Sequence, residues 1–183
     1  MEIFDLRIKG LKLVKPKVFK DSRGFFLESF QESQYKKMGI EGHFPQDNHS
    51  YSQQNCIRGM HFQSHPGQAK LIRVAVGKIY DVAVDIRLDS PTYGEWEAVI
   101  LDDQDFYQFY IPVGFAHGFC ILSPEAHVLY KVSHPYNPIT EKGFRWDDPD
   151  INIHWPTQTP LVSERDQTSP FFKELDQFAG VKT

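Results

Sequence analysis

Short runs in which apolar and polar residues alternate dominate this chain, and they predict β-strands. The run from residue 79 to residue 87 is typical, because apolar Val82, Val84 and Ile86 alternate with charged residues such as Asp81 and Asp85. A period of two places the apolar residues on one face of a strand and the polar residues on the other. Pro and Gly separate the runs, as turn residues do.

The alternation and the turn residues together predict strands over residues 12–18, 23–30, 69–76, 79–87, 96–101, 107–111, 118–122 and 126–133. We expect the first two to be edge strands around a turn at residues 21–24. The 69–76 and 79–87 strands are expected to form a hairpin about Gly77-Lys78.

Two short helices complete the prediction. One covers residues 31–38 and ends at Gly39, and one covers residues 169–179 on the outside of the protein. Regular strands without intervening helices favour an antiparallel sandwich or barrel such as a jelly roll. The mouth of such a barrel offers a cavity lined by inward-pointing side chains.

The composition fits a single domain over residues 1–183 with a sizeable core. Aromatic residues make up 14% of the chain, which favours strands. The formal net charge of -4 gives no sign of a nucleic-acid or membrane partner, so an anionic ligand must be held by a local group of Arg and Lys.

The first residues and the lack of a long apolar run make the cytoplasm the expected compartment. Residues 1–5 lack the basic start and apolar run of a signal peptide, and no apolar stretch approaches the roughly 20 residues that span a bilayer. Cys56 and Cys120 lie in apolar contexts and are expected to be buried free thiols.

Polar residues near residue 60 suggest a site. Arg58 and His61 stand three apart, so they share a face only if the strand bends, and Gly59 favours such a bend. With Lys70 they would suit an anionic substrate. A metal is the rival interpretation, but His61-Phe62-Gln63 lacks the H-x-H pair followed by Glu of metal-binding barrels, so we expect none. Taken singly, such residues more often have structural than catalytic roles.

Longer motifs are more specific, and they resemble the dTDP-4-dehydrorhamnose 3,5-epimerase family from about residue 16 to residue 166. The resemblance rests on segments in the family's order, at residues 21–28, 46–50, 57–63, 70–74, 81–87 with 90–92, 111–119 and 146–149. It implies an all-β, cupin-type jelly-roll barrel with a few short peripheral helices. It also implies a homodimer with exchanged N-terminal strands, and neither metal nor cofactor.

The resemblance further implies a reaction on a dTDP-linked 4-keto-6-deoxy sugar, whose C4 ketone acidifies the protons on C3 and C5. His61 matches the family's base and Asp166 the carboxylate that orients it. Tyr130 matches the general acid, and Lys70 would stabilise the enolate. The positions that match ligand contacts are Arg23, Glu28, Gln46, Asp47, Asn48, Arg58, His117, Tyr136, Glu141 and Arg165. Among these, Tyr136 would stack on the thymine ring.

Two positions depart from the family's pattern. Arg165 stands where Lys is expected, which keeps the charge and changes the geometry of a phosphate contact. Met60 stands where Leu is usual, which conserves volume. The sequence leaves open an enzyme that inverts only C3 or only C5. A non-catalytic carbohydrate-binding barrel would not need the His, Asp, Tyr and Lys that this chain retains.

Overall fold

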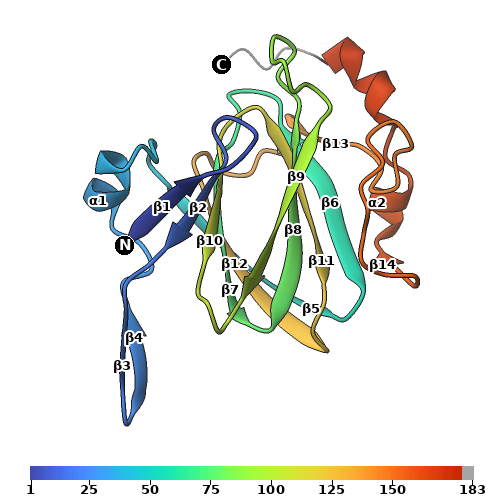
Figure 1. Cartoon of the computed structure of the whole chain (residues 1–183). Helices are drawn as coiled ribbons and strands as arrows, with labels where there is room; N and C mark the ends of the chain where they lie inside the picture. Colours follow the sequence, from blue (N-terminus) through green and yellow to red (C-terminus); the bar gives the residue numbers. More distant parts are fainter. Residues whose placement is uncertain (179–183) are drawn as a thin grey trace.

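The computed structural model describes residues 1–178 and consists of two β-sheets packed face to face, with a separate hairpin and short helices at the periphery (Figure 1). In spatial order, the first sheet contains β1 (Glu2–Asp5), β2 (Lys12–Lys15), β10 (Gln108–Ile111), β7 (Lys70–Val76), β12 (Glu125–Val132) and β5 (Gln46–Gln53). The second contains β13 (Glu141–Gly143), β6 (Cys56–Gln63), β11 (Phe115–Ile121), β8 (Lys78–Asp85) and β9 (Trp96–Asp102), with β14 (Leu161–Val162) beside β6. This is the all-β, cupin-type jelly roll expected from the sequence.

The expected 69–87 hairpin is wrong. β7 pairs with β10 and β12 in the first sheet, whereas β8 pairs with β9 and β11 in the second. The chain crosses from one sheet to the other at Gly77, which has a positive φ of 87° and lies so close to Glu125 and Ser123 that a Cβ would collide with them. The chain therefore does turn at Gly77, as predicted, but this turn joins a strand of one sheet to a strand of the other.

Apolar side chains fill the space between the sheets and also cover the outer face of the second sheet. The inner cluster includes Ile72, Ile79, Phe109 and Phe119. The outer cluster packs Val82 and Val84 of β8, with Met60, against the C-terminal segment, including Phe144, Ile151 and Phe172. Strand β8 is consequently buried on both faces. The side chain of Asp81, a polar residue of this strand, points between the sheets.

The N-terminal strands are shorter than expected, because Pro16 separates β2 from β3 (Val18–Asp21). β3 pairs with β4 (Gly24–Leu27) about the predicted turn at residues 21–24. In Figure 1 this hairpin projects away from the two sheets.

The first predicted helix is confirmed as α1 (Glu32–Lys37), capped by the Gln31 side chain and followed by Gly39 at a φ of 77°. A further short helix is α2 (Glu164–Gln167), in which Ser163 caps the backbone N–H of Asp166. The predicted 169–179 helix is instead the 3₁₀ helix η1 (Phe172–Phe178), and residue 179 lies outside the described residues. None of the helices within residues 1–178 has the length and apolar character needed to cross a membrane.

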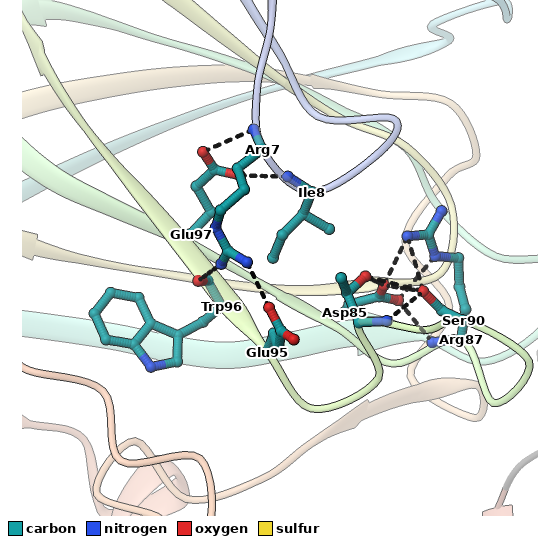
Figure 2. Close-up of polar contacts among 9 residues, drawn as sticks. Arg7, Ile8, Asp85, Arg87, Ser90, Glu95, Trp96 and Glu97 are labelled. Carbon is teal, nitrogen blue, oxygen red and sulfur yellow. Dashed lines mark hydrogen bonds and ion pairs between the residues drawn. The ribbon is translucent and has the colours of Figure 1, made fainter.

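Two polar clusters fasten the edges of the barrel (Figure 2). The Glu97 carboxylate accepts the backbone N–H groups of Arg7 and Ile8, at 3.1 and 2.8 Å, and so ties the N-terminal segment to β9. Buried Asp85 accepts both Arg87 Nε and Nη2, at 2.8 and 2.6 Å, and a hydroxyl from Ser90 at 2.6 Å. The motif at residues 85–92, which contributed to the family resemblance, therefore organises the corner between β8 and β9.

A pair of facing glycines shapes β6 where its polar residues lie. Gly59 has a φ of 122°, and a Cβ there would stand 2.6 Å from the Cα of Gly118 on β11. A Cβ on Gly118 would stand 2.6 Å from Met60 Sδ. This close approach coincides with a shift of register between β6 and β11, so the predicted bend at Gly59 is confirmed.

Candidate active site

A cavity of about 470 Å³ opens between the two sheets, and most of the predicted site residues line it. The second sheet contributes Arg58, His61 and His117, and the first contributes Lys70 and Tyr130. The remaining predicted residues on its wall are Gln46, Asn48, Tyr136, Glu141, Arg165 and Asp166. The fold thus gathers residues that are more than 100 positions apart in the sequence.

His61 and Asp166 form a pair at one wall of the cavity. His61 Nε2 lies 2.7 Å from Asp166 Oδ1, and the other carboxylate oxygen accepts the backbone N–H of Gly59 at 3.2 Å. Burial would raise the pKa of Asp166, but its bonds to His61 and Gly59 outweigh burial and leave the pKa lowered. An ionised Asp166 favours the tautomer in which Nε2 carries the hydrogen, so His61 Nδ1 keeps its lone pair and can act as a base.

Lys70 lies at the floor of the cavity and is 7% exposed. Its Nζ donates a hydrogen bond of 3.3 Å to the backbone oxygen of His61. Burial lowers the pKa of Lys70 to about 8, although the negative charges of Glu141 and Asp81 act in the opposite direction. The ammonium is therefore mainly protonated at neutral pH and is available to a developing oxyanion.

Tyr130 lies on β12 of the first sheet and lines the cavity from the sheet that faces the one carrying His61. Burial raises the pKa of Tyr130, and Glu141 adds to the effect while Arg58 opposes it. The phenol is therefore protonated at neutral pH and can donate a proton.

The residues at the mouth of the cavity hold one another in place. Arg165 Nη2 donates to Glu141 Oε2 at 2.6 Å, and Gln46 Oε1 accepts the backbone N–H of Tyr136 at 2.8 Å. Arg58 Nε donates to the Ser52 hydroxyl at 2.9 Å, which orients its guanidinium. Two guanidinium groups at one cavity suit a ligand that carries phosphates.

Three predicted ligand contacts lie away from this cavity in the single chain. Arg23 lies at the tip of the β3–β4 hairpin, and Glu28 follows β4. Asp47 points outward from β5, because its neighbours on the strand point inward, and it forms an ion pair with Lys131 at 2.8 Å.

Sequence reasoning missed several wall residues, among them Gln68 and Phe119. It also missed Asp81, which binds His117 beneath the cavity at 2.8 Å. The signal for Asp81 was its place on the face of β8 that also carries Ile79 and Ala83, both inside the barrel. Within residues 1–178, no group of three or more His, Cys, Asp or Glu side chains is arranged to hold a metal ion.

The sequence has close relatives. The family model described as dTDP-4-dehydrorhamnose 3,5-epimerase matches residues 5–174. The chain is 46% identical over 180 residues to a dTDP-4-dehydrorhamnose 3,5-epimerase of Neisseria gonorrhoeae, a match that covers 98% of this chain and 55% of that protein. A protein of the same name from Shigella flexneri is 45% identical, and the match covers 97% of this chain and 99% of that protein. The chain therefore spans about half of the first relative and nearly all of the second.

The fold is similar to that of a solved enzyme. A crystal structure of the dTDP-6-deoxy-D-glucose-3,5-epimerase of Legionella pneumophila, in complex with dTDP-4-keto-L-rhamnose, superposes with a TM-score of 0.93. The two chains are 43% identical, and the match covers 96% of this chain and 95% of that one.

Proposed function

Because the chain belongs to the dTDP-4-dehydrorhamnose 3,5-epimerase family, we propose that it inverts C3 and C5 of dTDP-4-keto-6-deoxy-D-glucose to give dTDP-4-keto-L-rhamnose. The chain is an isomerase of the epimerase type. The observation that carries the proposed substrate and mechanism is the cavity itself. It holds a His–Asp pair on the second sheet, a protonated tyrosine on the first, and a buried lysine whose Nζ bonds to the backbone oxygen of His61.

The reaction follows from these groups. His61 takes the proton from the carbon next to the ketone, and the electron pair of the broken C–H bond moves onto the C4 oxygen as an enolate. Lys70 stabilises that negative charge, while Asp166 stabilises the imidazolium. Tyr130 then returns a proton to the other face of the same carbon as the enolate electron pair re-forms the C4 carbonyl. Solvent reprotonates the phenolate of Tyr130, and the imidazolium of His61 gives its proton to solvent, so both groups are restored. The opposed positions of His61 and Tyr130 favour inversion over simple exchange.

The cavity mouth would bind the rest of the substrate. Arg58 and Arg165 carry the charge that suits the diphosphate, and Arg165 has N–H donors besides the one that bonds to Glu141. Tyr136 is 52% exposed at the rim, where its ring is free to stack on the thymine base.

Isotope exchange tests this function. We expect the protein, incubated with dTDP-4-keto-6-deoxyglucose in deuterated water, to place deuterium at both C3 and C5 and to invert both centres, as followed by NMR. Deuterium at one carbon only would show that the enzyme acts at that carbon alone, as a single epimerase. Deuterium at neither carbon would rule out the epimerase on this substrate.

The projecting hairpin supports a homodimer in which each copy completes the site of the other. Its exposed aromatic side chains are Phe19, Phe25 and Phe26, of which Phe26 is 69% exposed. Exposed apolar groups of this size on one short hairpin are typical of a surface that a partner covers. A second copy seated there would place Arg23 and Glu28, which are distant from the cavity of their own chain, near a neighbouring cavity.

Charge on the hairpin should weaken the dimer. We expect Phe26→Asp to shift the protein toward a monomer in light scattering coupled to size exclusion, because a carboxylate cannot be buried there without a partner charge. Affinity for dTDP should fall with it. Leu88→Asp, a matched change of a 53% exposed residue in the β8–β9 corner, should alter neither property. A Phe26→Asp protein of unchanged mass and affinity would contradict the exchange of hairpins.

A further inference from the structure

We propose that Asp81 is a positioning residue of this site, which fixes the tautomer of His117 with one carboxylate oxygen and sustains the positive charge of Lys70 with the other. The inference rests on the proposed function, because it assigns a purpose to Lys70 as the cation beside the enolate. Asp81 itself touches neither the cavity surface nor the substrate's position.

The first contact is a buried Asp–His pair. Asp81 is 0% exposed on the inner face of β8, and its Oδ1 lies 2.8 Å from Nε2 of His117. Burial lowers the pKa of His117 in spite of the opposing charge and hydrogen bond of Asp81, so the ring is neutral at pH 7. With the hydrogen on Nε2, Nδ1 is a pure acceptor. His117 lines the cavity, so that acceptor selects a sugar hydroxyl over a carbonyl oxygen at its wall.

The second oxygen of Asp81 calls for a compensating positive charge. Oδ2 is buried and has no hydrogen-bond partner among residues 1–178. A buried carboxylate with an uncommitted oxygen is costly unless a positive charge nearby compensates it. Lys70 brings a positive charge to this part of the second sheet from the facing one, because its Nζ bonds to the backbone oxygen of His61 at 3.3 Å and His61 is paired with His117 in the register of β6 and β11. Asp81 is one of two carboxylates whose negative charge favours the protonated form of Lys70.

The other carboxylate is already engaged. Glu141 accepts a 2.6 Å bond from Arg165, whereas Oδ2 of Asp81 is uncommitted. The other titratable groups that line the cavity with Lys70 are Cys56, Arg58, His61, His117, Tyr130, Tyr136, Arg165 and Asp166. The carboxylate of Asp166 is bonded to His61, and His117 is neutral. Asp81 therefore holds the buried carboxylate oxygen that no other group within residues 1–178 engages.

Removing the negative charge of Asp81 should therefore let Lys70 lose its proton at a lower pH. Burial would act on the ammonium with less compensation, so its pKa would fall below its present value of about 8. As pH rises, the enolate would lose its stabilising cation earlier than in the unaltered protein. The alkaline limb of kcat/KM should move to lower pH, and activity should recover in part on acidification.

The test is to titrate Lys70 directly by NMR in protein carrying ¹³C-labelled lysine, with Lys70→Arg used to assign the signal. In Asp81→Asn, which keeps the shape and removes the charge, we expect the midpoint to fall by about one pH unit or more. If Asp81→Asn does not fold, Asp81→Ser removes the same charge, and the midpoint of Lys70 is measured in that variant instead. Asp89→Asn, the same change at an exposed site, should leave the midpoint in place.

A Lys70 midpoint that is equal in the unaltered protein and in the folded Asp81 variant would overturn the proposal, even if activity fell. The titration needs no substrate and measures no turnover. Its failure is therefore distinct from failure of the deuterium-exchange experiment, which tests the reaction.

Discussion

Replacing His61 by asparagine is expected to lower kcat by about 10³-fold, on the scale of a lost general base, while dTDP still binds. Asparagine can keep a polar contact with Asp166, so the local structure should survive. It offers no group that takes up a proton near pH 7. The nucleotide would be held by groups at the mouth, such as Arg58 and Tyr136, which the substitution leaves intact.

Turnover should be measured by NMR, nucleotide binding by calorimetry and folding by thermal unfolding. His43→Asn makes the same chemical change at an exposed histidine outside the cavity and should retain full activity. A folded His61→Asn protein with near-normal turnover would show that another group is the base. Loss of dTDP binding in parallel with turnover would instead assign His61 to the binding of the nucleotide.

Replacing Tyr130 by phenylalanine is expected to separate deprotonation from inversion. The ring remains and only the hydroxyl is lost, so the packing of β12 should change little. His61 and Lys70 still form the enolate, and His61 can return a solvent-derived proton to the original face. We expect deuterium uptake at C3 or C5 without inversion, and net epimerisation reduced by about 10²-fold or more.

Tyr80→Phe is the matched control, because Tyr80 packs against Trp155 in the outer cluster and does not line the cavity. If exchange and inversion fall together in Tyr130→Phe, the hydroxyl acts before deprotonation, for example in holding the sugar. If neither falls, the acid lies elsewhere, and the hydroxyl of Tyr136 at the rim is the next group to test.

The sequence predicted those parts of the fold that depend on local signals. Gln31 and Gly39 bracket α1 correctly, because capping and a left-handed residue act within one turn. The turn at residues 21–24 was correct for the same reason. The pairing of β7 and β8 was not, since a Gly-Lys turn has the same local chemistry whether it joins neighbouring strands or links two sheets.

The site residues show the same contrast between what local signals predict and what depends on tertiary structure. Arg58 and His61 were expected to meet through a bend at Gly59, and the structure brings both to the cavity because Gly59 and Gly118 approach closely. Asp81 was missed because an acidic residue that alternates with valines suggests a solvent-facing side. Only the tertiary structure shows that this polar side faces the interior, where His117 accommodates the carboxylate.

The division of the site between two sheets has a mechanical consequence. His61 reaches the cavity from one layer and Tyr130 from the other, so the thickness of the sandwich sets the span between the proposed proton acceptor and the proposed proton donor. Facing sheets stand about 10 Å apart, and the bulk of side chains such as Phe109 and Ile72 maintains that spacing. Truncation of one of these side chains would leave a void or let the sheets shift, and either change would alter the gap in which the sugar ring is proposed to fit. Core residues that do not contact the substrate therefore help to set the size of the sugar that the cavity accepts.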